Sequence, residues 1–359
     1  MKGSVLIAGF ATRHVAQSAW KAGYTVYAVD HFCDQDLSWY TADRLKFDDL
    51  EELPDRIAEM AGRHRADFFV PTSGAETLGP PFPLAGTDPG TAARLLDKLE
   101  VQRFFEREQI PAPPLAGEGD FPYIAKPRCG AGGWRNAVIR SGEDLARWRE
   151  ENAGTEPLLQ ELVPGTPASV SCLADGRGHA VALAANEQIL RGCGANPFGF
   201  TGSVTPLSHP LAGQMRILAM RAAAASGCAG SAGVDFVLGA EAVAIEVNPR
   251  FQGTVDTVEA ATGISLFSLH LDACQGKLPA ELPLPGCTAM RGILFADRDL
   301  VVEEDLAPLA PSVADIPWPG TAFEEGQAVV SVLGTGKDRE EAFQDLDNIL
   351  NKLKRYMGR

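Results

Sequence analysis

Two carboxylates and an amide are spaced so that one face of a β-hairpin collects them. Residues 234–238 and 243–247 alternate apolar with other side chains, as two paired antiparallel strands do. With a four-residue connection, Asp235 lies directly opposite Glu246. A two-residue connection keeps the same faces, whereas an odd connection breaks them. Either even register therefore predicts that Asp235, Glu246 and Asn248 share one face.

These side chains are hard oxygen ligands, a set that suits magnesium carried in by phosphates. Arg250 follows Asn248 by two residues, and a guanidinium beside the cluster can neutralise a terminal phosphate. The four-residue connection also pairs Leu238 with Val243. The competing interpretation is a hairpin whose polar face is merely solvated.

A lysine at the end of a strand precedes a glycine-rich loop. Residues 123–126 predict a strand ending in Lys126, and Gly130, Gly132 and Gly133 follow. Glycines let backbone amides approach phosphate oxygens, and the lysine adds a point charge. No Gly-Lys-Ser or Gly-Lys-Thr follows, so the loop is not a Walker A motif. Taken alone, the segment is equally well a plain hairpin turn with an edge lysine.

Two further segments flank Lys126 along the chain. Lys98 precedes it by 28 residues, and an apolar strand at 158–162, which contains Glu161, follows it. Each segment is weak evidence by itself. In this order, however, two lysines, a glycine loop, a strand with a glutamate and a Glu-x-Asn hairpin are hard to obtain by chance.

Other polar residues stand where ligands could reach them. Arg191 lies in a glycine-rich stretch and could contact a reacting phosphate, or it is an exposed loop arginine. Glu76, Thr12 and Arg13 follow predicted strands of an α/β unit, the edge at which such sheets bind substrates. For all of them a structural role is the alternative.

Several chemistries lack support. The seven cysteines are scattered without a Cys-x-x-Cys pair, which indicates a reducing compartment and argues against structural zinc. The six histidines show no pairing, and no nucleophile elbow accompanies them. The first turn, at residues 9–13, lacks Gly-x-Gly-x-x-Gly spacing, which argues against a bound NAD.

The elements that carry these residues divide the chain. Residues 1–90 alternate strands and helices, which predicts a small parallel α/β unit. Beyond it, glycine-rich joints separate short strands, which predicts a mainly antiparallel α+β unit. The predicted helices cover residues around 15–20, 58–65, 91–109, 143–151, 212–226 and 338–357, and the predicted strands cover 5–9, 24–29, 67–71, 123–126, 137–140, 158–162, 169–173, 180–186 and 328–333, the last followed by a joint at 334–336.

The amino-acid composition limits the classes of protein to which this chain can belong. The chain has 359 residues, 45% of them hydrophobic and 22% charged, which is typical of a globular protein with a large core. Thirty-two Lys and Arg against 47 Asp and Glu give a net charge of −15 with no basic run, which argues against nucleic acid as a partner. The apolar run at residues 4–11 is too short to span a membrane and lacks a cleavage site, so we expect a cytoplasmic protein.

Together these segments resemble the ATP-grasp superfamily, the carboxylate-activating ligases related to carbamoyl-phosphate synthetase, biotin carboxylase and D-alanine ligase. The resemblance covers nearly the whole chain. It implies a Rossmann-like pre-ATP-grasp domain at 1–90, a two-lobed ATP-grasp domain with ATP in its cleft at 91–285, and an extension packing back on it at 286–359. The stretch beginning EVNPRFQGTVDTVEAATG looks closest to an archaeal branch of predicted ATP-dependent carboligases, and tyramine-glutamate ligase is a more distant comparison.

The resemblance implies a role for each candidate. Lys98 and Lys126 would contact the phosphates and purine of ATP, and the glycine loop at 130–133 would close over the triphosphate. Glu161 and Val163 would supply the hinge that holds the adenine. The metal ligands for two Mg²⁺ (or Mn²⁺) ions would be Asp235, Glu246 and Asn248, and the residues acting on the transferred phosphoryl group would be Arg250 and Arg191.

Two positions depart from the family pattern. Where many members carry a ribose-binding glutamate past the hinge, this chain reads Pro-Ala-Ser at 167–169. Trp134 replaces the usual small residue after the glycine loop. The expected function is an ADP-forming carboxylate–amine ligase acting on small molecules, with a homodimer as an open expectation. The alternatives are a bicarbonate-activating carboligase and a regulatory module that binds ATP without turnover.

Overall fold

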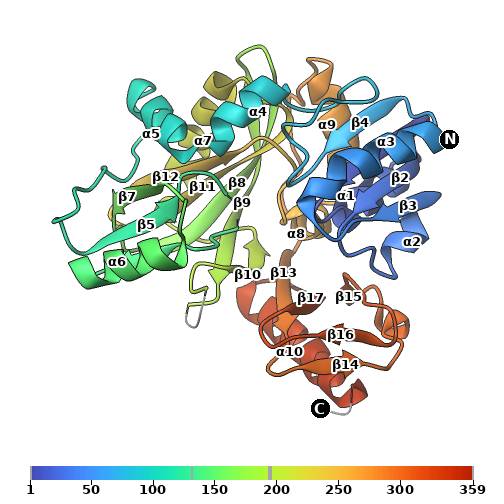
Figure 1. Ribbon diagram of the computed structural model, residues 1–359. Coiled ribbons are helices and arrows are strands. Elements are labelled where there is room, and N and C mark those ends of the chain that lie inside the picture. The colour runs from blue at the N-terminus through green and yellow to red at the C-terminus, as the bar shows by residue number, and fades with distance from the viewer. Residues whose placement is uncertain (1, 131, 193–195, 358–359) are drawn as a thin grey trace.

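A four-stranded parallel sheet forms the N-terminal unit of the computed structural model, which describes residues 2–130, 132–192 and 196–357 (Figure 1). The strand order is β3-β2-β1-β4. Three of these strands were expected, but β3 was not, because its Asp-Arg-Leu-Lys sequence has no apolar run. The elements are β1 (Ser4–Gly9), α1 (Arg13–Lys21), β2 (Thr25–Asp30), α2 (Leu37–Tyr40), β3 (Asp43–Lys46), a 3₁₀ turn (Leu50–Glu52), α3 (Leu53–Arg63) and β4 (Phe68–Pro71).

The single helix predicted over residues 91–109 is wrong, because two helices occupy this segment. They are α4 (Pro89–Leu96) and α5 (Lys98–Arg107). Asp97 between them has an extended backbone, and its carboxylate accepts hydrogen bonds from the backbone amides of Leu99 (3.0 Å) and Glu100 (3.3 Å). Asp97 is therefore the N-cap of a new helix.

A small antiparallel sheet in the order β6-β5-β7 carries the lysine strand and lies beside α6 at the edge of the molecule (Figure 1). Its core contains Tyr123, Ile139 and Trp148, so α6 covers the sheet through its apolar side. These elements agree with the expected ones to within a residue or two. They are β5 (Tyr123–Pro127), β6 (Ala137–Ile139), α6 (Gly142–Glu151) and β7 (Pro157–Glu161).

The largest sheet has eight strands in the order β12-β11-β8-β9-β10-β13-β17-β15. Small and branched residues of β8, β11 and β12 pack against α7 in one core. The expected joint at 334–336 is in fact part of β17, which pairs with β13 through Gly336. The elements are β8 (Thr166–Asp175), β9 (Ala180–Leu190), β10 (Phe200–Thr205), α7 (Ala212–Ser226), β11 (Ala229–Leu238), β12 (Ala242–Asn248), β13 (Thr288–Phe295), β15 (Val313–Ala314) and β17 (Ala328–Gly336).

Two helices join the N-terminal unit to this sheet. In one core, Val15 of α1 and Ile7 of β1 belong to the same cluster as Phe267 and Leu173, which come from α9 and β8. The helices α8 (Val255–Thr262) and α9 (Leu266–Cys274) thus form a layer between the two sheets. The segment that carries Asn248 and Arg250 leads directly into this layer.

The C-terminal segment adds strands to the large sheet and ends in a helix that covers it. Leu346 of α10 (Arg339–Tyr356) packs with Met290 and Val332 of the sheet. A separate two-stranded sheet pairs β14 (Leu300–Val302) with β16 (Thr321–Phe323), and a 3₁₀ turn spans Ala307–Leu309. The mixed α/β fold is as expected, whereas the boundaries at residues 90 and 285 stay a prediction. Within the described part of the chain, none of the helices combines the length and apolar character needed to cross a bilayer.

Candidate functional site

The β11–β12 hairpin brings the predicted metal ligands together by a route that differs from the expected one. Its connection has three residues, because Leu238 pairs with Ala242 and not with Val243. A β-bulge then inserts one residue of β12, and Asp235 lies opposite Glu246 as predicted. An odd connection alone would have put the two carboxylates on opposite faces. The bulge restores them to one face.

Hydrogen bonds tie the cluster together. Asn248 Nδ2 donates to Asp235 Oδ2 (3.0 Å), and Gln188 Nε2 on β9 donates to Asp235 Oδ1 (3.0 Å). Arg250 Nη1 donates to Asn248 Oδ1 (2.8 Å). Asp235, Asn248 and Arg250 are therefore neighbours, as the sequence predicted. Gln188 was not predicted, because nothing in the β9 sequence shows which strand lies next to β8.

The protonation of Asp235 reflects its surroundings. Burial and, after it, the negative charge of Glu246 raise its pKa to about 7, although the hydrogen bonds from Asn248 and Gln188 and the charge of Arg250 oppose the rise. Asp235 and Glu246 are half-buried and lie opposite each other, which favours a cation between them because the cation removes their repulsion.

The donor chemistry fits a hard divalent cation in part. Across the described residues, no three His, Cys, Asp or Glu side chains gather in a group able to hold a metal. The cluster offers two carboxylates, and the amide oxygen of Asn248 is occupied by Arg250. An ion held by two carboxylates needs oxygens from elsewhere, and Mg²⁺ in phosphate-binding sites takes them from phosphate and water. Asp235 and Glu246 thus fit magnesium that arrives with a nucleotide.

Lys126 is buried at the end of β5 and lies in a chain of side-chain hydrogen bonds. Its Nζ donates to Gln160 Oε1 (2.8 Å), Gln160 Nε2 donates to Gln102 Oε1 (2.8 Å), and Gln102 Nε2 donates to Glu106 Oε1 (2.8 Å). Because a carboxylate only accepts, Glu106 fixes the orientation of both amides and turns an acceptor toward Lys126. Neither glutamine was predicted as part of the site.

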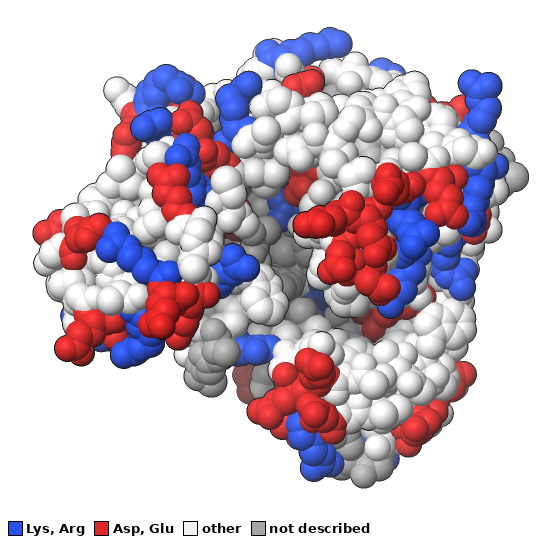
Figure 2. Space-filling model, in the orientation of Figure 1, with Lys and Arg blue, Asp and Glu red and all other residues white. Residues whose placement is uncertain are grey.

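The pKa of Lys126 is lowered to about 8, and burial is the largest cause. The charge of Glu246 opposes this shift and the charge of Lys98 adds to it, so these three residues interact electrostatically. The strand of Lys126 belongs to the small sheet and Glu246 to the large one. The lysine and the carboxylate pair therefore come from different sheets but lie close enough for their charges to interact. The surface of the molecule is hollowed near its centre (Figure 2).

Lys98 and the glycine loop lie together at the start of α5. Lys98 Nζ donates to the carbonyl of Gly130, and the backbone amide of Lys98 donates to the carbonyl of Arg128 (2.9 Å). Gly132 and Gly133 have φ of +70° and +72°, a conformation that favours glycine. A Cβ on Gly133 would lie 2.3 Å from the carbonyl oxygen of Phe198, which follows β9. Ala131, in the same predicted loop, lies outside the described residues.

The two predicted hinge residues follow or end β7. Glu161 pairs with Tyr123 in the small sheet, and its side chain is exposed, while Val163 is half-buried. Trp134, which departs from the family pattern, is 69% exposed.

Arg191 makes its contacts away from the carboxylate cluster. Its guanidinium donates to the carbonyl of Gly326 (3.0 Å) and lies over the ring of Phe295 at 4.2 Å. Cys193 and Gly194, in the same stretch, are not described.

Glu76 is brought to the cluster from the N-terminal unit. Its carboxylate is buried, and Oε1 lies 3.3 Å from Arg250 Nε. Thr12 is buried and its hydroxyl donates to Asp30 Oδ2 (2.8 Å), which links the turn between β1 and α1 to the end of β2. Glu76 therefore joins Arg250 at the site, whereas the contacts of Thr12 are internal to its own unit.

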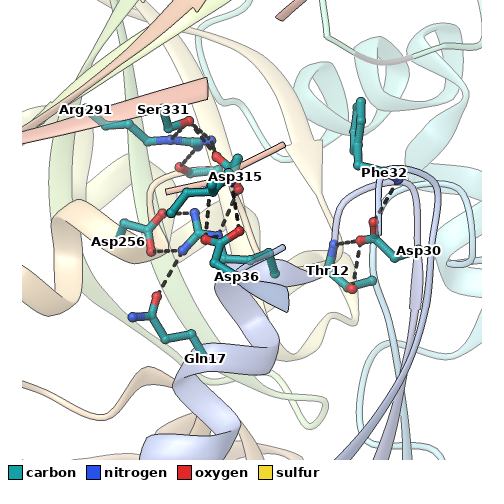
Figure 3. Close-up of polar contacts among 12 residues, drawn as sticks. Thr12, Gln17, Asp30, Phe32, Asp36, Asp256, Arg291, Asp315 and Ser331 are labelled. Carbon is teal, nitrogen blue, oxygen red and sulfur yellow. Dashed lines mark hydrogen bonds and ion pairs between the residues drawn. The ribbon is translucent and has the colours of Figure 1, made fainter. Parts of the chain in front are cut away.

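Arg13 lies in a buried ionic network, and Figure 3 shows its partners Asp36, Asp256 and Asp315 gathered in one place. It is 3% exposed and contacts Asp256 (2.6 Å), Asp315 (2.8 Å) and Asp36 (3.6 Å). Arg291 contacts the same Asp315 (2.7 Å), and its Nη1 donates to the carbonyl of Gly253 (2.9 Å). Burial raises the pKa of Asp256, but the charge of Arg13 and its hydrogen bond to Asp256 outweigh burial and hold this pKa below its usual range. Because the guanidinium of Arg13 is already paired with three carboxylates, these contacts favour a structural role for Arg13 over substrate binding.

The comparisons with known proteins agree with this geometry. A family model described as an ATP-grasp domain matches residues 95–254, which contain the lysine strand and the carboxylate hairpin. The chain contains an ATP-grasp domain. The resemblance seen in the sequence is thereby confirmed, and the placement near the archaeal carboligases stays a prediction.

The curated relatives are longer proteins. The carbamoyl phosphate synthase large chain of Xylella fastidiosa is 26% identical over 321 residues, covering 79% of this chain and 30% of that protein. The C-terminal section of the carbamoyl phosphate synthase large chain of Methanopyrus kandleri is 24% identical over 306 residues, covering 76% of this chain and 55% of that protein. This ATP-grasp chain thus spans less than two thirds of the length of these relatives.

Solved structures show the same fold. The biotin carboxylase complex of Campylobacter jejuni superposes with a TM-score of 0.79 at 16% identity, covering 97% of this chain and 90% of that one. Phosphoribosylamine–glycine ligase of Thermotoga maritima gives a TM-score of 0.75 at 17% identity, covering 97% and 96%. The fold of this ATP-grasp protein therefore extends beyond the matched domain to nearly the whole chain.

Proposed function

We propose that this protein is an ATP-dependent ligase that forms ADP and phosphate and joins a small carboxylate to an amine. The observation that carries the proposal is the half-buried pair Asp235–Glu246 with Arg250 beside it, close enough to Lys126 for the charges of Glu246 and Lys126 to interact. Phosphoryl transfer asks a protein mainly to place positive charge around the moving group, and these residues do so with a metal ion.

The proposed reaction has two steps. An oxygen of the substrate carboxylate attacks the γ-phosphorus of ATP, the bond to the β–γ bridging oxygen breaks, and ADP leaves. The amine nitrogen then attacks the acyl carbon, phosphate leaves with the carbon–oxygen bond pair, and the amine loses a proton. Magnesium supplies charge neutralisation on the phosphates when bound. Lys126 would hold the phosphates from the small lobe, and Arg250 would stabilise the transferred group.

The test combines product analysis with trapping. Enzyme, Mg-ATP and a panel of carboxylic acids are incubated with hydroxylamine, and ADP, AMP and acyl hydroxamate are measured. We expect ADP and a hydroxamate for the correct acid, and Glu246→Gln should lower this turnover by orders of magnitude while the protein stays folded. AMP formation would refute the mechanism. ADP release with bicarbonate alone would favour the carboligase, and saturable ATP binding without turnover would favour a regulatory module.

The partners follow from this proposal. The substrates would be a small carboxylate and an amine, with ATP and Mg²⁺ (or Mn²⁺) as nucleotide and metal. A homodimer and a cytoplasmic location remain expectations. The biotin carboxylase domain of Hydrogenobacter thermophilus, which has a TM-score of 0.78 with this chain, is described as a dimer. Light scattering on the purified protein would decide the oligomeric state.

A further inference from the structure

Four aromatic rings gather where the strands of the N-terminal sheet end. Phe10 follows β1, His31 and Phe32 follow β2, and Phe47 follows β3, three strands that are neighbours in the sheet. The Phe10 and His31 rings stack at 4.5 Å and 12°, and Phe32 meets both edge-on, at 5.2 Å from Phe10 and 4.8 Å from His31. His31 also lies 5.6 Å from Phe47.

Two of these rings are only half covered. Phe10 is 38% exposed and Phe32 is 42% exposed, whereas Phe47 is buried in the core of the unit. Neither Phe10 nor Phe32 belongs to the hydrophobic cores found among the described residues. In the described part of the chain, no group hydrogen-bonds His31 Nδ1, so the imidazole is held by its ring contacts and its backbone. An exposed aromatic patch of this kind marks a binding surface.

The ring patch lies next to the proposed active site. The backbone amide of Phe10 donates to the carbonyl of Ser73 (2.7 Å) in the loop after β4. Three residues further along, Glu76 contacts Arg250, which contacts Asn248 of the carboxylate hairpin. The Phe32 ring stands apart from the Arg13 network (Figure 3). Open α/β sheets bind ligands at the carboxyl ends of their strands, which is where these rings lie.

We propose that this patch, made by Phe10, His31 and Phe32, binds a planar ring of the substrate. One of the two molecules joined by the enzyme is then an aromatic or heteroaromatic acid or amine, with its reactive group extending toward Glu76 and Arg250. This inference rests on the proposed function for the identity of the reaction, but not for the binding itself. A ring stacked on Phe10 or Phe32 gains contact area and favourable ring geometry that a saturated ring lacks.

The first experiment measures binding without ATP. Saturation-transfer NMR titrations compare 3-phenylpropionate with 3-cyclohexylpropionate, and 2-phenylethylamine with 2-cyclohexylethylamine, at millimolar concentrations. We expect the phenyl member of one pair to bind more tightly than its saturated partner, and the pair that shows this tells whether the ring belongs to the acid or the amine. Equal binding within both pairs, or no binding by any of the four, would overturn the proposal.

The second experiment places the ring on the patch. Phe32→Leu and Phe10→Leu keep an apolar side chain but remove the ring face, so each should weaken binding of the phenyl probe by roughly three- to tenfold. Trp20→Leu is the control, because Trp20 is a 52% exposed aromatic of α1 in the same unit. Equal losses in all three variants, or no loss in either phenylalanine variant, would contradict the assignment.

These outcomes separate the two proposals. If the phenyl probe binds at the patch but no acid yields ADP and a hydroxamate, the ring site stands and the ligase proposal fails. If ADP and a hydroxamate form with acids that lack a ring while neither phenyl probe binds, the ligase proposal stands and the ring site fails.

Discussion

The protonation of Asp235 makes the stability of the protein depend on pH. Its pKa is raised to about 7 by burial and by Glu246, so the folded protein holds the proton more tightly than the unfolded chain does. Stability from this group is therefore fully present below about pH 4 and is lost as pH rises toward 7.

We therefore expect metal-free Asp235→Asn to be more stable than the natural protein at pH 8, by on the order of 1 to 4 kcal/mol. The difference should shrink at pH 5, where Asp235 is protonated. Urea unfolding in EDTA at both pH values measures this. The variant should also lose the thermal stabilisation that Mg²⁺ gives. Asp272→Asn, at an exposed position of α9, serves as the control. A variant less stable than the natural protein at pH 8 would contradict the charge argument.

Lys126 is the residue on which nucleotide affinity should depend most directly. Lys126→Met removes a charge-assisted phosphate contact worth about 1.5 to 3 kcal/mol, so ATP should bind roughly tenfold to a hundredfold more weakly by calorimetry. Lys46→Met is a matched control, because Lys46 is 56% exposed and its partner is the exposed Asp48. An unchanged ATP affinity in folded Lys126→Met would remove this lysine from the site.

At the scale of elements, the hydrogen-bond chain from α5 through β7 to β5 should tune that lysine. The pKa of Lys126 is about 8, so ATP affinity in the natural protein should fall as pH rises through 8 and the ammonium is lost. Gln160→Glu places a carboxylate where the amide acceptor stood, which favours the ammonium and should move this fall to higher pH. Gln160→Met removes the acceptor and should move it to lower pH. Calorimetric titrations between pH 6.5 and 9.5 compare the three proteins, and coincident profiles would show that the chain does not act on Lys126.

The carboxylate hairpin shows how far sequence periodicity reaches. Alternation predicted both strands, and it predicted Asp235 opposite Glu246, which the structure confirms. The pairing of Leu238 with Val243 was wrong, because the connection has three residues and Ile245 is the extra residue of the bulge. The sequence Ala-Ile-Glu gives no sign of a bulge, because the bulge depends on how β11 and β12 pair and pack against α7 in the folded protein. The predicted pairing of Asp235 with Glu246 is thus confirmed, but it depends on a bulge that the sequence did not predict.

Residues that depend on distant partners were harder to predict. Gln188 and Gln160 join the site only because β9 lies next to β8 and β7 next to β5, and strand order is not written in any one segment. Asp97 was predicted inside a helix because good helix formers follow it. In the structure its carboxylate instead caps the N-terminus of α5. Motifs that are contiguous in sequence, such as the glycine loop, were predictable because their conformation is local.

For the whole molecule, the Arg13 network holds three parts of the chain together. Arg13 comes from α1, Asp256 from α8, and Asp315 from the turn after β15, where its φ is +55°. Both backbone amides that follow β15, those of Asp315 (3.0 Å) and Ile316 (2.9 Å), donate to the carboxylate of Asp36. The segment that carries Arg250 ends in this network, so its stability bears on the site.

Arg13→Met should cost about 3 to 5 kcal/mol of stability at pH 7, because it leaves buried carboxylates without their cation. In the natural protein the pKa values of Asp256 and Asp315 are held low, so their contribution is present above about pH 4 and is lost below it. Urea unfolding at pH 7 measures the loss. Arg63→Met, which breaks only surface pairs with Glu59 and Asp43, should cost less than about 1 kcal/mol. Equal losses in the two variants would show that the network adds nothing beyond a surface pair.

The same network sets an order of events during protein synthesis. Arg13 and Asp315 are separated by 302 residues, although their side chains lie 2.8 Å apart in the folded protein. A ribosome adding on the order of 5 to 20 residues per second needs roughly 15 to 60 s to make the intervening chain. The four-stranded N-terminal sheet can form from residues made early, but Arg13 must wait beside it without Asp315 for that whole interval. The nascent N-terminal unit is therefore an incompletely neutralised intermediate, and it reaches its final stability only after Asp315 has been made.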